Sequence, residues 1–314
     1  MFEKILEEIE RAKRIIIHRH TNPDGDAIGS QTGLKLLLSE NYPDKEILAV
    51  GDPTARYGFI EGSEADEVED GAYADALAII LDTSASALIS DARYKTAART
   101  ARIDHHIFCE RIADVELTDT SYESCAGLVA ALSMEAGWRL TPLAAKALYT
   151  GMITDSGRFR YDSTTAETFE RAAYLMSVPF DTSDIYSNLY SDDFKFIRLR
   201  AEFVLKIKFT ENRVAYIYTT EEEMKNIGAD SFTVSRGMVN TMSEIRGTKA
   251  WVNFTEHEGK VLCELRSNKY NVNKIAVKYG GGGHLKASGA TVSSREEAMK
   301  MLADLDALAG GENE

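Results

Sequence analysis

Short apolar runs alternate with longer amphipathic segments through the first half of the chain. The apolar runs predict buried strands at residues 14–18, 45–50, 76–81 and 101–103. Apolar positions at helical spacing predict helices at residues 29–39, 127–136 and 143–153. Because strands alternate with helices, we expect an α/β domain with a parallel sheet and helices on both of its faces.

The pattern changes after about residue 180. Residues 181–193 are rich in Asp, Ser and Tyr, which is typical of a connecting segment that can be helical in part. Further strands are predicted at residues 213–219, 249–255, 260–265 and 290–292, and helices at 231–245, 271–279 and from 294. The second and third of these strands should form a hairpin that turns near Glu258 and Gly259. We therefore expect a smaller α+β domain, with boundaries at 1–184, 185–195 for the linker, and 196–314.

The composition is typical of a soluble protein of two domains, and it limits the kinds of partner and substrate that we expect. A chain of 314 residues with 44% hydrophobic and 27% charged residues is ordinary for a globular protein of two domains. The first residues lack the pattern of a signal peptide, and every apolar run is shorter than the roughly 20 residues of a membrane helix, so we expect a cytoplasmic protein without a membrane partner. The net charge of -14 disfavours long duplex nucleic acid, whereas a small phosphate-bearing substrate remains compatible because metal ions reverse the local field.

Side chains that bind hard metal ions follow the predicted strands. They are His20, Asp24 and Asp26 after the first strand, Asp82 after the third, Asp104, His105 and His106 after the fourth, and Asp155 after a predicted helix. Ligands in a parallel sheet collect at the carboxyl ends of its strands, so these side chains should form one site. Several carboxylates with imidazoles predict two divalent ions and phosphoryl-transfer chemistry, with Mn²⁺ favoured and Mg²⁺ or Co²⁺ as substitutes.

The residue types suggest roles within such a site. Asp24 and Asp26 lie two apart in one loop, so each can direct a carboxylate to a different ion. Asp82 can bridge both ions, and His105 with Asp155 can complete the second, which leaves a bridging hydroxide as the nucleophile.

The neighbouring residues have both functional and ordinary structural interpretations. Asp104 is placed to orient an imidazole, and His106 can protonate the leaving oxygen or bind the phosphate. Taken singly, residues 22–25 form a good turn sequence, Asp82 could be a helix cap, and a His pair is usually a surface or core pair. The concurrence of four segments at one sheet edge favours the metal site.

At this point the motifs resemble those of the DHH phosphoesterase superfamily. The matching stretches are His20-Thr-Asn-Pro-Asp24-Gly-Asp26, Leu81-Asp82-Thr83, Asp104-His105-His106 and Thr154-Asp155-Ser-Gly157. The stretch Gly280-Gly-Gly-Gly-His284-Leu-Lys-Ala-Ser288-Gly289 resembles the signature of the associated DHHA1 domain. The compact layout is similar to that of nanoRNases (oligoribonucleases) that are also pAp (3'-phosphoadenosine 5'-phosphate) phosphatases, and to enzymes that degrade the dinucleotide pApA.

The resemblance implies a catalytic DHH domain, a substrate-binding DHHA1 domain and an active site in the cleft between them. It assigns one manganese to His20 and Asp24, the other to Asp26, His105 and Asp155, and a bridging role to Asp82, with His106 facing the phosphate. Substrate contacts would come from Arg266, Ser267, Gly281, Gly282, Gly283 and His284, with Arg158 and Arg160 as further candidates for the phosphate. No ligand position departs from the family pattern, although Ser156 and Ser288 replace commoner residues.

The implied activity is manganese-dependent hydrolysis of pAp, pApA and short RNA or DNA oligomers by a protein that can be a homodimer. The substrate order and the direction of attack stay open. A family II inorganic pyrophosphatase shares the first-domain motifs, but its second domain lacks the glycine run of residues 280–283. A non-catalytic nucleotide sensor is the other alternative, and it would be expected to have lost metal ligands.

Overall fold

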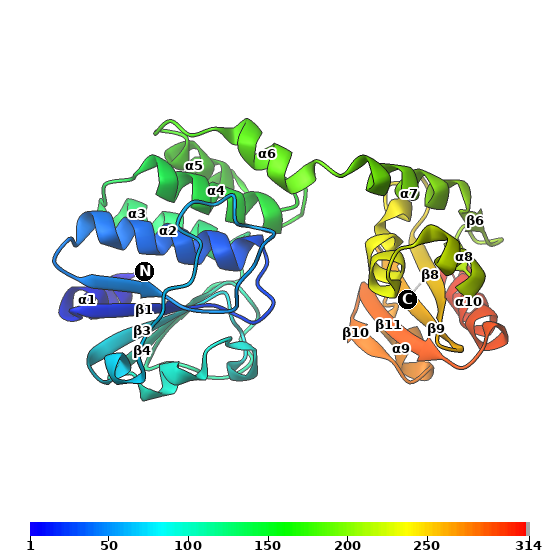
Figure 1. Ribbon diagram of the computed structural model, residues 1–314, viewed down its shortest axis with the longest axis horizontal. Helices are drawn as coiled ribbons and strands as arrows, with labels where there is room; N and C mark the ends of the chain where they lie inside the picture. Colours follow the sequence, from blue (N-terminus) through cyan, green and yellow to red (C-terminus); the bar gives the residue numbers. More distant parts are fainter. Residues whose placement is uncertain (312–314) are drawn as a thin grey trace. The chain divides into compact units, whose positions relative to one another are not determined.

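The computed structural model describes residues 1–311 and contains two compact units, Met1–Ser191 and a second unit that begins at Asp192 (Figure 1). The first unit is built on a five-stranded parallel sheet in the order β2-β1-β3-β4-β5. Its strands are β1 (Arg14–His18), β2 (Glu46–Ala49), β3 (Ala76–Leu81), β4 (Arg99–Asp104) and β5 (Val115–Thr118). The parallel sheet is confirmed, and β5 is an additional edge strand whose half-buried residues give no apolar run.

Helices and short turns cover the two faces of this sheet. The helices are α1 (Glu3–Arg11), α2 (Gly25–Asn41), α3 (Cys125–Ala136), α4 (Pro142–Asp155), α5 (Ala166–Leu175) and α6 (Thr182–Tyr190). Alternate residues of β1 point to opposite faces, so Ile15 and Ile17 pack in the core with α1–α4. On the other face Ile16 packs with Tyr73 of the 3-10 helix η1 (Asp70–Asp75). Ile80 of β3 joins Tyr94 of η3 (Ala92–Thr96) there.

Helix α2 begins four residues before the predicted start, and this changes where the first ligands lie. Asp24 is its N-cap, and its Oδ1 accepts hydrogen bonds from the amides of Asp26 and Ala27 at 3.0 Å each. The expectation that Asp26 lies in a loop is therefore wrong, because the cap draws it into the first helical turn. The sequence did not reveal this start, because the first turn of α2 contains glycine and aspartate and few apolar residues at helical spacing.

The second unit is a mixed sheet in the order β10-β11-β9-β8-β7-β6. Its strands are β6 (Lys208–Phe209), β7 (Ala215–Thr219), β8 (Ala250–His257), β9 (Lys260–Ser267), β10 (Gly282–His284) and β11 (Ala287–Val292). Its helices are α7 (Phe194–Leu205), α8 (Glu221–Ile227), α9 (Asn273–Lys278) and α10 (Arg295–Gly310). The β8–β9 hairpin is confirmed, and Glu258 and Gly259 at its turn both have positive φ, 51° and 73°.

Two short segments replace the helix predicted at residues 231–245. They are η4 (Thr233–Gly237), a π-helical turn, and the 3-10 helix η5 (Val239–Met242). The buried amide of Asn253 donates to the carbonyl oxygens of Val234 and Ser235 at 2.7 and 2.8 Å, which diverts both carbonyls from an ordinary helical ladder. In residues 1–311 no helix combines the length and the apolar character needed to cross a bilayer.

Candidate metal centre

The structure brings the predicted metal ligands together at the carboxyl edge of the parallel sheet. They form three overlapping groups, in each of which the ligand atoms lie within 4.8 Å of one another: His20, Asp24 and Asp82; Asp26, His105 and Asp155; and Asp82, His105 and His106. Asp155 is the one that comes from the end of a helix, α4. Four separate segments therefore converge on one cluster, as the motif spacing predicted.

Two imidazoles present the same nitrogen to the cluster. The Nδ1 atom of His20 lies 2.7 Å from the carbonyl oxygen of Thr21, and that of His105 lies 3.4 Å from the carbonyl oxygen of Tyr122. In a neutral ring, Nδ1 then carries the proton and donates it to the carbonyl. The Nε2 lone pair is thereby left to face the carboxylates, which is the usual arrangement of a metal-binding histidine.

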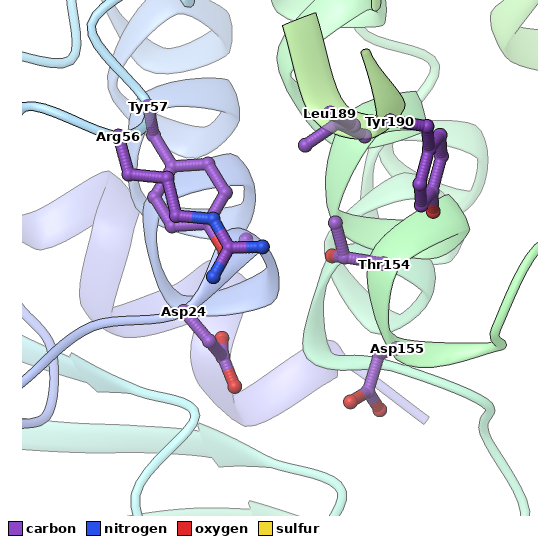
Figure 2. Close-up of a pocket in the computed structure, with 8 residues that line it drawn as sticks. Asp24, Arg56, Tyr57, Thr154, Asp155, Leu189 and Tyr190 are labelled. Carbon is purple, nitrogen blue, oxygen red and sulfur yellow. The ribbon is translucent and has the colours of Figure 1, made fainter. Parts of the chain in front are cut away.

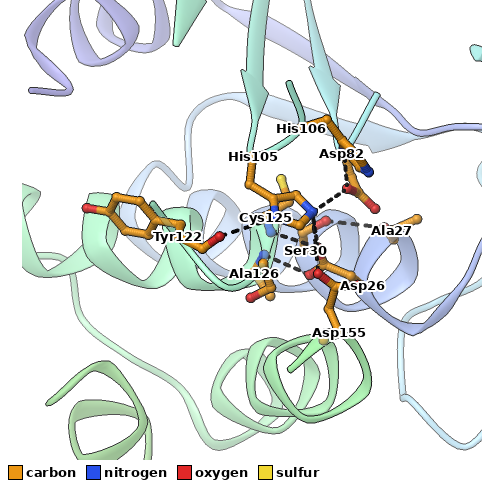
Figure 3. Close-up of polar contacts among 12 residues, drawn as sticks. Asp26, Ala27, Ser30, Asp82, His105, His106, Tyr122, Cys125, Ala126 and Asp155 are labelled. Atoms are coloured by element: carbon orange, nitrogen blue, oxygen red, sulfur yellow. Dashed lines mark hydrogen bonds and ion pairs between the residues drawn. The ribbon is translucent and has the colours of Figure 1, made fainter. Parts of the chain in front are cut away.

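Asp82 lies between the imidazoles of His20 and His105, and Figure 3 shows its contact with His105. Its Oδ2 is 3.5 Å from Nε2 of His20, and its Oδ1 is 3.4 Å from Nε2 of His105. The side chain is buried, and within residues 1–311 Oδ1 has no hydrogen-bond donor. The residue also has a φ of 52°, a left-handed conformation that Asp tolerates better than most residues and that is often found at functional sites. One oxygen thus faces each group.

Asp26 is fixed by the start of α3. Its Oδ2 accepts a hydrogen bond from the amide of Cys125 at 2.7 Å, and its Oδ1 accepts one from the amide of Ala126 at 2.9 Å (Figure 3). These are amides at the first turn of a helix, which ordinarily attract an anion. The same carboxylate lies 3.8 Å from Nε2 of His105, so α3 holds it in place for the cluster.

Asp104 and His106 form a pair beside the cluster. Oδ1 of the buried Asp104 is 2.8 Å from Nδ1 of His106, and it also accepts the His106 backbone amide at 3.3 Å. This contact raises the pKa of His106, against the opposing effect of burial. The pair therefore has the geometry that the predicted orienting role requires, with Nε2 of His106 as the ring nitrogen left for a substrate.

The cluster concentrates negative charge. Burial raises the pKa of Asp26 well above its ordinary value, and the charges of Asp82 and Asp155 add to this. Burial similarly raises the pKa of Asp155 to about 6. For His20, burial lowers the pKa, but hydrogen bonds with Asp24 and Asp82 outweigh it and raise the pKa to about 10. Against the effect of burial, contacts with the imidazoles of His105 and His20 instead lower the pKa of Asp82. The raised pKa values of Asp26, Asp155 and His20 reflect a concentration of negative charge that divalent cations would offset.

The donor set fits divalent ions of the Mn²⁺ or Mg²⁺ class. It combines carboxylate oxygens with the Nε2 atoms of two oriented imidazoles, and it includes a buried carboxylate oxygen without a donor. The residues that would hold the ions are those of the first two groups, with Asp82 between them.

Two of the predicted substrate residues of the second unit, Gly281 and Gly282, line a cavity of about 590 Å³, whereas Arg266, Ser267, Gly283 and His284 are not part of its lining. It is lined by the glycines at 280–282 and by Arg236 and Glu264. Glu264 lies between two arginines, with Oε1 at 3.0 Å from Nε of Arg236 and Oε2 at 3.1 Å from a terminal nitrogen of Arg266. Sequence reasoning missed Arg236, because it stood inside a predicted helix with no motif around it.

The remaining predicted contacts have structural roles that the sequence did not reveal. The Ser267 hydroxyl donates to the Lys249 carbonyl at 2.6 Å and accepts the Tyr270 amide at 2.6 Å, so it holds a turn. The amide of Gly281 donates to the carbonyl of Ala276 at 2.9 Å. A Cβ at Gly281 would collide with the backbone of Gly289, so this glycine is required for close packing against β11. Gly282, Gly283 and His284 form β10, at the edge of the sheet.

Arg158 lies in an unusual turn after Asp155. Gly157, Arg158 and Phe159 all have left-handed backbones, with φ of 58°, 63° and 59°. The Arg158 guanidinium lies 4.6 Å from the centre of the Tyr190 ring, within the range of a cation–π contact. In this conformation Arg158 supports Tyr190, and its predicted contact with a phosphate stays a prediction.

The sequence also matches known families over both units. Residues 14–152 match the model of the DHH family, N-terminal domain, and residues 206–311 match the DHHA1 domain. The bifunctional oligoribonuclease and PAP phosphatase NrnA of Bacillus subtilis is 35% identical over 98% of both chains. The probable bifunctional oligoribonuclease and PAP phosphatase NrnA of Streptococcus mutans is 31% identical over 98% of both chains.

A solved structure shows the same architecture. The crystal structure of an exopolyphosphatase-related protein from Bacteroides fragilis superposes with a TM-score of 0.85 at 28% identity, over 98% of this chain and 95% of that one. Full-length similarity to NrnA proteins at more than 30% identity, together with both domain matches, settles the family. This chain therefore belongs to the DHH phosphoesterase family, hydrolases of phosphoester bonds, with a DHH domain followed by a DHHA1 domain.

Proposed function

We propose that this chain hydrolyses short oligonucleotides and dinucleotides such as pApA to mononucleotides, and that it dephosphorylates pAp to AMP. The observation that carries the proposal is the set of six ligand side chains, which form two groups linked by Asp82: it belongs to the group with His20, and its Oδ1 lies 3.4 Å from Nε2 of His105 in the other group. The names of the NrnA relatives from Bacillus subtilis and Streptococcus mutans support the same substrates. The cyclic-di-AMP phosphodiesterase GdpP of Bacillus subtilis is 27% identical over 95% of this chain, which corresponds to 48% of the length of GdpP.

The protein's own residues would prepare the site for two Mn²⁺ ions. When bound, such ions would polarise a phosphoryl oxygen and activate water for in-line attack. Asp82 would set the spacing between them, because its two oxygens face different groups. His20 and His105 keep Nε2 toward the site through the hydrogen bonds of their Nδ1 atoms. The α3 amides hold Asp26 in a single orientation.

His106 would contact the substrate directly. With Nδ1 held by Asp104, its Nε2 is available to contact the phosphate or to hold the proton that the leaving oxygen takes. In the second unit, Arg266 and His284 would contact the nucleotide, and Arg236 is an additional candidate because it lines the same cavity as the glycine run. Glu264 would have to release Arg266 when a phosphate binds.

The test compares pApA hydrolysis by the wild type, Asp82→Asn and the control Asp75→Asn, with Mn²⁺ present. Asp75 ends η1 just before β3, at the opposite end of that strand from Asp82, and its exposed carboxylate pairs with Arg14 at the start of β1. We expect AMP from the wild type and the control, and a loss of at least about 10²-fold with Asp82→Asn, because a ligand shared by both ions is removed. A circular dichroism spectrum should show that the fold is kept. Substantial activity in Asp82→Asn would refute the shared role.

A further inference from the structure

A small cavity lies in the first unit beside the metal centre. Its volume is about 200 Å³, and both Asp24 and Asp155 line it (Figure 2). Asp24 belongs to one of the two main ligand groups and Asp155 to the other. The cavity therefore adjoins both groups, which is where a phosphate bound by two ions would lie.

The sides of this cavity carry aromatic rings, an aliphatic side chain and a guanidinium group. Arg56 and Tyr57 lie on one side, and Leu189 and Tyr190 lie on the other (Figure 2). Tyr57 is only 4% exposed, and the Arg56 guanidinium is 5.5 Å from the centre of its ring. Tyr190 is braced by Arg158, whose guanidinium lies 4.6 Å from the ring centre. Such surfaces suit a flat aromatic group better than a phosphate, which would need several donors.

The volume limits what can enter. Pockets for drug-sized ligands measure roughly 300–1,000 Å³, so a cavity of about 200 Å³ has room for one ring system and not for a dinucleotide. Stacking on tyrosine and arginine faces is the usual way in which proteins hold unpaired bases without selecting their sequence.

We propose that this cavity binds the nucleobase adjacent to the scissile phosphate, between the Arg56–Tyr57 side and Tyr190. The inference rests on the proposed function, and it adds a base subsite on the catalytic unit itself. Tyr190 and Arg56 become specificity-determining residues for nucleotide over simple phosphate substrates. Because every base has a stacking face, the subsite should accept purines and pyrimidines alike.

The test uses Tyr190→Ala, Tyr190→Phe and the control Phe169→Ala. Phe169 is an exposed aromatic of α5 that contacts Phe159 and does not line the cavity. Each protein is assayed with pApA and with two analogues that each lack one base. The wild type should prefer pApA over one of the analogues by roughly 10-fold in kcat/KM, the size expected of one stacking contact. Tyr190→Ala should abolish this preference, and Tyr190→Phe and Phe169→Ala should keep it.

Binding of AMP, measured by calorimetry with and without Mn²⁺, separates this inference from the proposed function. If the wild type fails to cleave pApA but binds AMP roughly 10-fold more tightly than Tyr190→Ala does, the base subsite stands and the proposed function falls. Equal AMP affinity in the wild type and Tyr190→Ala, or an unchanged preference for pApA in Tyr190→Ala, overturns the subsite.

Discussion

The close approach of α2 and α4 makes the substitution Gly29→Ala informative. A Cβ at position 29 would lie 2.6 Å from the carbonyl oxygen of Ala147 and 2.8 Å from the amide nitrogen of Gly151. Both atoms belong to the backbone of α4, so neither can rotate away. Asp26 is on α2 and Asp155 ends α4, and the contact at Gly29 therefore sets how closely two ligand residues approach.

The magnitude follows from the overlap. Ordinary contacts involving carbon lie near 3.5–4.0 Å, so the helices would have to separate by up to about 1 Å. Overpacking of this kind costs about 1–3 kcal/mol, and the higher helix propensity of Ala returns up to about 1 kcal/mol. We expect a net loss of about 1–2 kcal/mol, which lowers the Tm of a unit of this size by about 2–8 °C. A displacement of 1 Å at an active site can lower the rate by about 10²-fold, so we expect a loss of kcat as well as the loss of stability.

Gly33→Ala is the matched control. Gly33 lies on the same helix two turns from the N-terminal end, but there a new Cβ would meet the buried side chain of Leu148 and not the backbone of α4, so the core has to repack without a direct push on the helix backbone. Both variants gain the same helix propensity, so the difference between them isolates the backbone contact.

The assay measures thermal unfolding in EDTA and initial rates with Mn²⁺ for the wild type and both variants. Gly29→Ala should unfold earlier and lose at least about 10-fold in kcat, whereas Gly33→Ala should also lose about 1–3 kcal/mol of stability through core overpacking but should keep a kcat close to that of the wild type. Equal behaviour of the two variants would refute the reasoning that the helix approach positions the site.

Three further predictions concern stability, metal binding and substrate contacts. Arg171→Ala should lower the free energy of urea unfolding by about 3–5 kcal/mol, because the buried carboxylate of Glu123, 2.6 Å from the guanidinium, loses its charged partner. The control Arg139→Ala breaks a solvent-accessible pair with Glu40 and should cost under about 1 kcal/mol. Equal losses in the two variants would contradict this prediction. Mn²⁺ at 100 times its Kd should add about 2.7 kcal/mol and raise the Tm, and EDTA should reverse the rise; no shift would argue against a metal site. Arg266→Ala should raise the KM for pApA, whereas Lys300→Ala, which breaks an exposed pair on α10, should not, and equal KM values would remove Arg266 from the substrate site.

Much of the fold was predictable because several strands are continuous apolar runs in the sequence. Ala76–Leu81 is apolar throughout, and the observed β3 has those bounds. The edge strand β5 was missed because its side chains are only half-buried, and the helix at 231–245 was wrong because a distant residue, Asn253, captures two of its carbonyls. Such tertiary contacts leave no periodic mark on the local sequence.

The candidate site, like the fold, was predictable only in part. Motif spacing on four segments predicted which ligand side chains would meet, because parallel strand ends lie at one edge. What the spacing did not reveal is how they are held. The capping role of Asp24 and the amides of α3 on Asp26 depend on helix starts, and the position of Tyr190 beside Asp155 depends on packing between α6 and the rest of the unit.

The most direct test of the central claim is a comparison of initial rates with Mn²⁺ on pAp, pApA, cyclic di-AMP, RNA oligomers of graded length and inorganic pyrophosphate. The account predicts turnover of pAp, pApA and the shortest RNA oligomers, falling as the oligomer lengthens, with little hydrolysis of pyrophosphate. Fastest turnover of pyrophosphate, or none of the nucleotides, would contradict it.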